Sequence, residues 1–314
     1  MRSLFINDQD QLRSGWRAII FLFAFVFLAG VLGTIVQIGL ATENVEASSS
    51  SSSYLIASAL TSLIAAILVG WQCGKLLENL PFRALGAAFI GRWPFNLIAG
   101  LTVGAATIGL AVLVAYAFGG LGFEWNQADY KVVLSSLIVS FAVFAAAAAF
   151  EEALFRGYIL QTLARSGYAW LAIALTSIVF GAVHLGNPDA SLVSTFNTIL
   201  AGVWFSVAYL KTRDLWFVWG LHLMWNWVQG SILGIEVSGM QAISKAPLLR
   251  EVDVGPTWLT GETYGIEGGI ACTVALAGSI AMIHFLSGLK PNEELYAMTE
   301  PIAGGMTKKD FAAD

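Results

Sequence analysis

The sequence predicts an all-α protein: a polytopic transmembrane helix bundle of about eight spans, with both termini in the cytoplasm. Hydrophobic residues make up 57% of the 314 residues and charged residues only 12%, and the mean hydropathy is +0.73. So few charges would leave a soluble domain short of polar surface. The charges also lie between long apolar stretches, as in proteins that cross a bilayer several times. We therefore expect a multi-pass membrane protein surrounded by membrane lipids.

Each predicted span is an apolar stretch that approaches the roughly 20 residues a helix needs to cross the hydrocarbon core. The first span is longer than the apolar region of a signal peptide and lacks a clear cleavage pattern, so we expect it to be retained. The fifth and sixth spans are separated only by the short polar stretch Gly186–Asp189. The predicted spans are 18–41, 55–73, 94–118, 132–158, 169–186, 192–210, 215–233 and 269–287.

The lysines and arginines predict the orientation of these spans. With these eight spans, 13 of the 16 basic residues fall on the same side of the membrane as both ends of the chain. The other side holds Lys131, Lys245 and Arg250. Because cytoplasmic loops carry an excess of basic residues, both termini are predicted to be cytoplasmic.

The chain divides into three parts along this map. Residues 1–131 hold spans one to three and a serine-rich tract, Ser48–Ser53, which we expect to be a flexible outside loop. Residues 132–233 hold spans four to seven. Residues 234–314 hold a long outside loop up to residue 268, the last span and a short cytoplasmic tail. The long loop is rich in Gly and Pro, and its sequence offers no catalytic constellation.

Several features count against other classes of protein. The net charge is -5 and no basic stripe is present, so no nucleic-acid partner is expected. Cys73 and Cys272 lie alone in or beside apolar segments, which is typical of buried small hydrophobic residues rather than of a disulfide or a metal pair. His284 has no polar partner at helical spacing and is expected to be interfacial.

Two adjacent glutamates end the long apolar run from Val132 to Phe150. Ionisable side chains at membrane depth cost several kcal/mol and usually face a protein interior or a watery cavity. Glu152 and Arg156 are four residues apart, so they share a helix face and are predicted to form an ion pair. Glu151 is rotated by about 100° and is left to face a cavity. The non-catalytic alternative is an interfacial pair with one snorkelling carboxylate.

Two later apolar segments each carry a histidine with a partner one helical turn away. Phe180 and His184 share a helix face, and Gly181 lets another helix approach closely. His222 and Asn226 likewise project together from one face. As packing residues, these side chains would hydrogen-bond neighbouring helices. As catalytic residues, the histidine–asparagine pair would stabilise a developing oxyanion.

In this order, the three motifs resemble the signature of the CAAX-protease and bacteriocin-processing (Abi) family, which is Glu-Glu-x-x-x-Arg, Phe-x-x-x-His and His-x-x-x-Asn. This family includes type II CAAX prenyl endopeptidases and lysostaphin-resistance-like proteins. The motifs stand here as Glu151-Glu152…Arg156, Phe180…His184 and His222…Asn226. The resemblance covers about residues 132–233, which would be the catalytic core, with Arg156 and Glu152 holding the helix geometry.

The resemblance implies an endopeptidase that cleaves a peptide bond within or near the bilayer. Glu151 would be the general base that activates water, assisted by His184, and His222 and Asn226 would donate to the oxyanion. The physical logic agrees, because hydrolysis needs a base within reach of a water and donors aimed at the developing charge. A low-dielectric site strengthens both effects.

A zinc metalloendopeptidase is the alternative chemistry, with Glu151, His184 and His222 as ligands and water in the fourth position. The sequence lacks the His-Glu-x-x-His pattern of site-2-type zinc proteases. The neighbouring Asn226 suits an oxyanion role better than zinc ligation. We therefore favour a glutamate-type mechanism without a cofactor. The Gly-x-Ser-Gly motif of rhomboid proteases and the Gly-x-Gly-Asp motif of presenilin-type proteases are absent.

Two other classes of function compete with the protease. In a non-catalytic membrane scaffold or bacteriocin-immunity protein, the same polar groups would only join helices. A transporter would show paired, interrupted helices in two halves, which the sequence lacks. The expected substrate is a peptide or a lipidated membrane protein, prenylated as in CAAX-box protein processing or not. The expected location is a bacterial plasma membrane.

Overall fold

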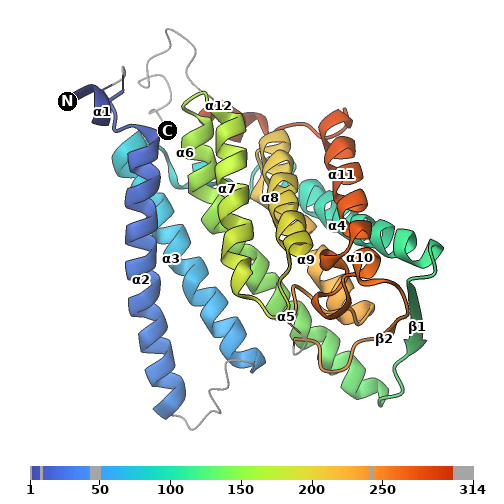
Figure 1. Ribbon diagram of the computed structural model, residues 1–314. Coiled ribbons are helices and arrows are strands. Elements are labelled where there is room, and N and C mark those ends of the chain that lie inside the picture. The colour runs from blue at the N-terminus through green and yellow to red at the C-terminus, as the bar shows by residue number, and fades with distance from the viewer. Residues whose placement is uncertain (1, 8–9, 43–50, 241–242, 300–314) are drawn as a thin grey trace.

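The computed structural model describes residues 2–7, 10–42, 51–240 and 243–299, and most of them are helical. The order of elements agrees with the predicted all-α class (Figure 1). The main helices are α2 (Ser14–Thr42), α3 (Ser52–Glu78), α4 (Trp93–Ala117), α5 (Tyr130–Leu154), α7 (Ala169–Val183), α8 (Leu192–Thr212), α9 (Leu215–Trp227) and α11 (Ile270–Phe285). Short helices are α1 (Arg2–Phe5), α6 (Leu160–Ala164), α10 (Thr257–Thr260) and α12 (Glu293–Thr299).

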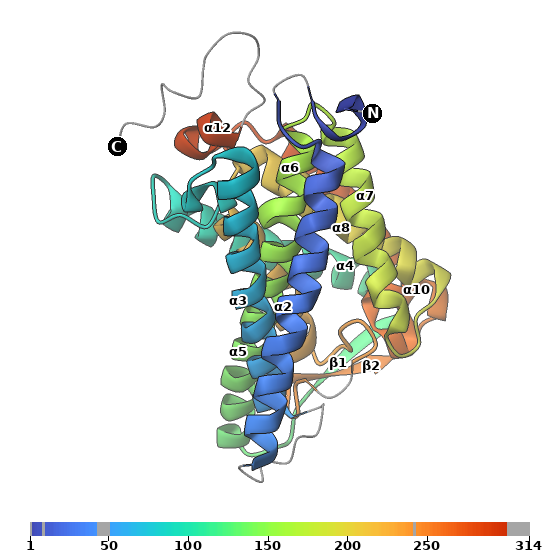
Figure 2. The ribbon, with the colours of Figure 1, turned by 90° about the vertical axis from the view of Figure 1, so that its left-hand side faces the viewer.

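Within the described residues, 6 helical segments are long and apolar enough to cross a membrane. They correspond to the first six predicted spans, and the fourth is extended to Tyr130–Ala164. The seventh predicted span is α9 with one further turn, and the eighth is α11, an apolar helix of 16 residues. The count of eight spans and the cytoplasmic termini stay predictions. Helices α1 and α12 do lie at the same end of the bundle (Figures 1 and 2).

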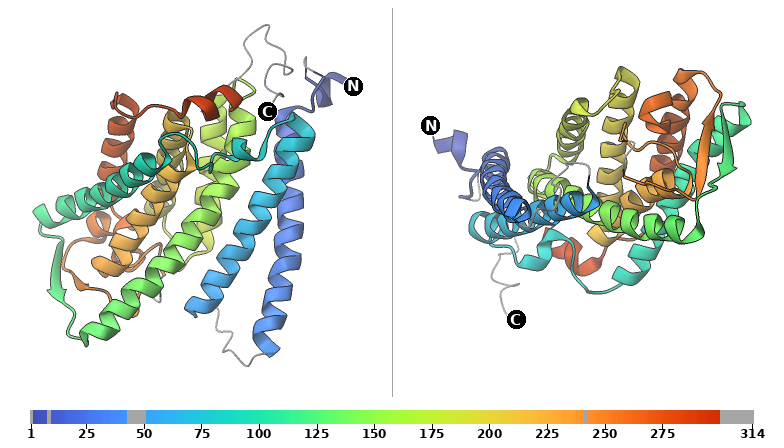
Figure 3. Two further views of the ribbon diagram at one scale, coloured as in Figure 1. Left: turned by 180° about the vertical axis from the view of Figure 1, so that it is seen from behind. Right: turned by 90° about the horizontal axis from the view of Figure 1, so that it is seen from below.

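The bundle consists of a peripheral helix pair and a larger group of packed helices. Helices α2 and α3 run side by side, and α5 crosses obliquely from this pair to the larger group, in front in the left view of Figure 3. At one end of α3, the Glu78 carboxylate binds Arg17 of α2 at 2.6 Å and Arg165, just after α6, at 2.8 Å. These buried ion pairs attach the helix pair to the rest of the bundle.

Glycines allow α4 and α9 to cross with almost no space between their backbones. A Cβ added at Gly100 would overlap the carbonyl oxygen of Phe217, and one at Gly104 would overlap that of Leu221. From the other side, a Cβ at Gly220 would lie 2.8 Å from a carbonyl of α4. Gly100 and Gly104 form a Gly-x-x-x-Gly pair, a pattern that permits close helix packing in membranes. The predicted close approach at Gly181 is also present, because a Cβ there would overlap a side chain of α8.

Asp214 fixes the start of α9. Its Oδ1 accepts a hydrogen bond from the Trp216 backbone N–H at 2.9 Å, and its Oδ2 accepts one from Asn96 of α4 at 2.8 Å. An aspartate in this position satisfies a free N–H of the first helical turn. Burial raises the pKa of the Asp214 carboxyl to about 6. The α4–α9 contact is therefore closed by a polar clamp at its end.

The long loop that is predicted to lie outside, residues 234–268, is more ordered than the sequence indicated. Its strand β2 (Leu249–Asp253) pairs antiparallel with β1 (Leu121–Trp125), with Leu121 opposite Asp253, in a sheet that the sequence analysis did not predict. The loop continues through α10 and two 3₁₀ turns, Glu262–Tyr264 and Ile266–Gly268. Strands β1 and β2 lie at the edge of the bundle, toward the end away from α1 and α12 (Figure 1).

The serine tract and the tail fall partly outside the described residues. Residues 43–50, which hold most of the predicted serine-rich loop, lie outside them, as do residues 300–314. Ser51 is the N-cap of α3 and accepts a hydrogen bond from the Tyr54 N–H at 3.3 Å, so the end of the tract starts a helix instead of continuing the loop. Serine is well suited to this position. The tail begins with helix α12.

We expect Gly104→Ala to destabilise the protein, because its methyl group would overlap the backbone of α9. Overpacking of this kind costs about 1–3 kcal/mol. The measurement is thermal unfolding in detergent, followed by tryptophan fluorescence. Gly109→Ala is the matched control, because it lies on the same helix and a Cβ there meets open space. Equal melting temperatures for the two variants would contradict the proposed role of the crossing.

Candidate active site

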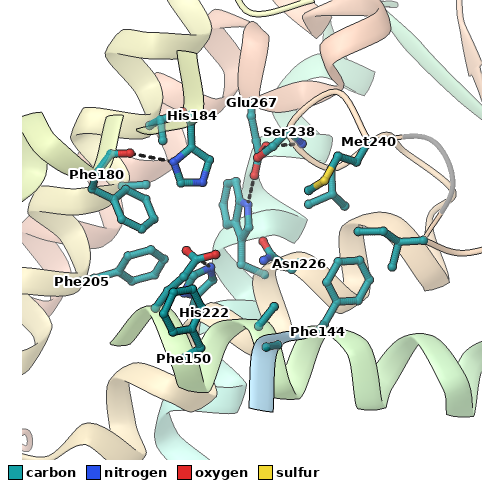
Figure 4. A pocket seen from close by; sticks show the side chains of 18 of the residues that line it. Phe144, Phe150, Phe180, His184, Phe205, His222, Asn226, Ser238, Met240 and Glu267 are labelled. Carbon is teal, nitrogen blue, oxygen red and sulfur yellow. Dashed lines mark hydrogen bonds and ion pairs between the residues drawn. The ribbon is translucent and has the colours of Figure 1, made fainter. Parts of the chain in front are cut away.

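The residues predicted as catalytic come together around one cavity. The cavity has a volume of about 260 Å³ and is lined by α3, α5, α7, α8, α9, the outside loop and α11. Glu151, His184, His222 and Asn226 all contribute to its wall, and Figure 4 shows the two histidines and Asn226 facing it. Three apolar segments that are distant in sequence thus place their polar side chains at one site.

Glu152 lies behind the cavity wall with its side chain only 1% exposed. Its Oε1 accepts hydrogen bonds from Arg156 Nη1 at 3.2 Å and from His222 Nδ1 at 2.8 Å. The predicted ion pair with Arg156 is therefore present. The bond to His222 was not predicted, because helical spacing relates residues on one helix and not on two. One carboxylate joins α5 to α9.

Arg156 is fully buried, and its contacts extend the connection to α8. Its Nη2 donates to the carbonyl of Gly202 at 3.0 Å. The guanidinium carbon lies 5.0 Å from the ring centroid of Phe180 and 5.1 Å from that of Phe205. These rings add cation–π attraction to the ion pair. A buried charge needs such compensation, because an unpaired ion in the interior costs several kcal/mol.

His222 is held by two contacts on different parts of its ring. The ring stacks on Phe205 with a centroid distance of 4.5 Å and an interplanar angle of 24°. Because its Nδ1 faces the Glu152 carboxylate, Nδ1 carries a hydrogen. The other nitrogen, Nε2, lies 3.9 Å from Glu151 Oε2. Nε2 can donate a hydrogen bond only when the ring is an imidazolium.

His184 has a defined tautomer for a different reason. Its Nδ1 lies 2.7 Å from the carbonyl oxygen of Phe180. A carbonyl oxygen only accepts, so Nδ1 is the donor and Nε2 of the neutral ring carries a lone pair. Figure 4 shows the ring between Phe180 and the pocket, with the other nitrogen toward the pocket. His184 begins a short 3₁₀ turn, His184–Gly186, just after α7 ends.

Glu151 and Asn226 offer polar atoms with no partner in the described parts of the chain. Glu151 Oε2 is buried without a hydrogen bond, although its side chain is 24% exposed overall. The Asn226 amide, one helical turn beyond His222, makes no hydrogen bond to a described residue. Polar atoms in an apolar cavity favour a bound partner, since a buried unsatisfied group costs about 1–3 kcal/mol.

A π-helical turn directly follows each of the two helices that carry most of these residues. One turn, Phe155–Ile159, continues α5, and the other, Val228–Ile232, continues α9. A π turn adds one residue to a helical turn and is frequent at functional sites. Arg156 lies within the first turn. Each π turn contains a glycine, Gly157 in the first and Gly230 in the second. Glycine is too common in the sequence for its presence to predict a π turn.

Sequence reasoning missed Glu267, which also lines the cavity. Its Oε1 accepts a hydrogen bond from Trp225 Nε1 at 2.9 Å, and its Oε2 accepts two from Ser238, each at 2.7 Å. The outside loop therefore supplies a carboxylate to the cavity, although its sequence offers no catalytic constellation. No local motif surrounds Glu267, so only the path of the loop could reveal it.

A catalytic zinc ion needs about three protein ligands arranged around one point. Among the described residues, no group of three or more His, Cys, Asp or Glu side chains is arranged to hold one. In particular, Glu151, His184 and His222 do not converge on a common point of ligation, and Cys73 and Cys272 are separate free thiols.

Residues 132–228 match the family model of Rce1-like proteins, described as type II CAAX prenyl endopeptidase Rce1-like. The resemblance to the CAAX-protease family is confirmed for this core. The matched segment runs from the first turn of α5 to the end of α9 and covers less than half of the chain. It includes all three motifs and therefore Glu151, His184, His222 and Asn226. No curated protein matched the chain.

We expect Glu152→Gln to destabilise the protein much more than Glu151→Gln. Removing the Glu152 charge leaves Arg156 buried without its carboxylate, and breaking a buried pair in this way costs about 3–5 kcal/mol. Glu151 has no ion-pair partner closer than 3.9 Å, so its replacement should leave the melting temperature unchanged or raised. Thermal unfolding of both variants in one detergent checks this. A larger loss for Glu151→Gln would reverse the assignment of the two carboxylates.

Proposed function

We propose that the protein is an intramembrane endopeptidase of the glutamate type, which hydrolyses a peptide bond of a membrane-associated substrate. One observation carries the proposal: Glu151 presents an unpartnered carboxylate oxygen to a cavity that also holds His184, His222 and Asn226. The Rce1-like match supports a CAAX-type protease in general. The roles of the individual residues follow from the chemistry that each side chain can perform.

Glu151 is the general base in this proposal. It takes a proton from a water in the cavity while His184 Nε2, with its lone pair, accepts the second hydrogen bond of that water and orients it. The resulting hydroxide attacks the carbonyl carbon of the substrate. Glu151 then returns the proton to the amide nitrogen, the C–N bond breaks, and a carboxylic acid and an amine leave. General acid–base catalysis by a positioned side chain contributes about 10²–10⁴-fold in rate.

His222 and Asn226 stabilise the tetrahedral intermediate. The Asn226 amide has free N–H donors, and His222 donates from Nε2 as an imidazolium, since Nδ1 is engaged with Glu152. Both side chains come from α9, so their spacing is set by the helix. Donors held in place in a low-dielectric site stabilise a developing negative charge far better than donors in water.

The proposed substrate is a peptide or a lipidated membrane protein that reaches the cavity at the surface of, or within, a bacterial plasma membrane. Prenylated CAAX-type peptides are the first class to test, because the matching family model describes prenyl endopeptidases. Substrates without a prenyl group are the second class.

A non-catalytic scaffold is the alternative function, and one observation favours it. Glu152, Arg156 and His222 form a buried network that connects α5, α8 and α9 whether or not a reaction takes place. In a scaffold, Glu151 would have no essential role. The two functions therefore differ in the effect of replacing Glu151 alone.

We expect Glu151→Gln to abolish peptide cleavage while the protein stays folded. Glutamine keeps the size and hydrogen bonding of the side chain but cannot act as a base, so the rate should fall by at least about 10²-fold. The assay follows a fluorescence-quenched farnesylated CAAX peptide with purified protein in detergent. Glu262→Gln, an exposed glutamate of the outside loop, is the matched control.

Cleavage that survives Glu151→Gln would disprove the assigned base. If neither the wild type nor the variant cleaves the farnesylated peptide, prenyl-peptide processing is excluded as the main activity, and unprenylated membrane peptides are tested in the same assay. If no membrane peptide is cleaved by the wild type, the scaffold is the better account.

We expect cleavage to continue after metal removal. Dialysis against EDTA and then 1,10-phenanthroline, followed by the same assay, should leave the rate within about 2-fold of the untreated protein, since neither base nor oxyanion donors require a metal. A known zinc protease treated in parallel confirms that the chelators work. Loss of activity that added Zn²⁺ restores would establish the metalloendopeptidase alternative.

A further inference from the structure

Glu267 has no role in the mechanism proposed above, yet it faces the same cavity. Figure 4 shows its carboxylate beside Ser238, across the pocket from His222. The outside loop brings it there: Glu267 belongs to the 3₁₀ turn Ile266–Gly268, directly before α11. The cavity therefore has a second polar end that is separate from the reacting groups.

The three hydrogen bonds to Glu267 come from neutral donors. Trp225 Nε1 and the backbone and side chain of Ser238 fix the carboxylate in place at 2.7–2.9 Å. None of the ion pairs within the described ranges includes Glu267. Its negative charge is therefore positioned but not neutralised. After burial itself, this charge is the second cause that raises the pKa of Tyr264.

Negative charges outnumber positive charges around the cavity. The carboxylates of Glu151 and Glu267 line it, and that of Glu152 lies behind its wall. Even with His222 protonated, the described residues next to the cavity supply two cations, Arg156 and His222, against these three carboxylates. A cavity with low-dielectric walls and an excess of one charge concentrates ligands of the opposite charge. The site therefore favours a ligand that carries a positive group.

The walls near Glu267 suit an aliphatic chain. Phe144, Val237, Met240 and Ile243 line the cavity together with the ring of Trp225, and Figure 4 shows Met240 next to Ser238. Lysine and arginine side chains have this composition, an apolar stem and a charged head, and they bury the stem on apolar surface. An indole ring beside a carboxylate adds attraction for the cationic head.

We propose that Glu267 is a specificity residue that binds a lysine or arginine side chain of the substrate close to the scissile bond. The proposal rests on the proposed function, because it assigns the cationic group to a peptide substrate. The stem of the basic residue lies along Met240 and Ile243, and its head binds the carboxylate that Trp225 and Ser238 hold in place.

The competing role of Glu267 is purely structural. In that role, its bonds to Ser238 and Trp225 only hold the outside loop against α9. Both roles predict a loss of stability when Glu267 is replaced. Only the recognition role predicts that the loss of binding depends on the charge of the substrate, so the experiment compares charged with neutral peptides.

The test measures peptide binding in the full-length Glu151→Gln protein, which does not require cleavage. Fluorescently labelled CAAX-type peptides, farnesylated and not, carry one lysine at each position in turn, and each has a partner with norleucine in its place. Fluorescence anisotropy in detergent gives Kd. We expect one lysine position to bind at least about 10-fold more tightly than norleucine, and the added Glu267→Gln substitution to bring this ratio to about 1.

Two further variants separate charge from structure. Ser238→Ala removes one hydrogen bond but keeps the carboxylate, so the preference for lysine should persist. Glu262→Gln, in the same loop but exposed, should leave the preference unchanged. The absence of a preference for lysine at every position, or an equal preference with and without Glu267, would overturn the proposal. If Glu267→Gln unfolds, the absence of a preference for lysine in the Glu151→Gln protein still overturns the proposal.

This result is distinguishable from failure of the proposed function. Cleavage by the wild type without any preference for lysine removes the role of Glu267 and leaves the protease intact. If the wild type cleaves no peptide but the preference for lysine depends on Glu267, the cavity is a cation site and the protease assignment is wrong.

Discussion

The buried Glu152 carboxylate is the interaction on which the rest of the site depends. It binds Arg156 on its own helix and His222 on α9, and Arg156 in turn binds the backbone of α8. With one oxygen, Glu152 neutralises a buried guanidinium and sets the tautomer of a histidine. Removing it would leave a charge without compensation at membrane depth, where water cannot replace the lost bonds. The adjacent Glu151 has a carboxylate oxygen without a hydrogen bond to any described residue, and this oxygen is available for chemistry.

The position of α9 is set by contacts along its whole length. Asp214 binds its first turn, and the glycine crossing brings its backbone against α4. The bond from His222 to Glu152 then fixes its rotation relative to α5. Because α9 is held at three points, His222 and Asn226 keep a constant position relative to the cavity. Such rigidity is what a preorganised oxyanion site requires, because donors that move lose their advantage over water.

Because of the outside loop, the two ends of the cavity carry different chemical groups. At one end lie the groups that can activate water and stabilise an oxyanion, and at the other lies a carboxylate fixed by neutral donors. Both ends belong to the same cavity of about 260 Å³. Reaction and recognition are thus assigned to different parts of the chain, the matched core and the loop outside it. The match of the core to the family model says nothing of the residues on the loop.

The sequence by itself determined the helical membrane class, the family of the core, and which residues share a helix face. Hydropathy, the order of the three motifs and the spacing of Glu152 from Arg156 are local properties, and local periodicity reports them directly. Only the tertiary structure decided that His222 binds Glu152, that Glu267 reaches the cavity, and that α4 and α9 cross on glycines. These contacts depend on the tilt and rotation of helices packed against one another. No spacing within one helix contains that information, because helix packing is a property of two surfaces.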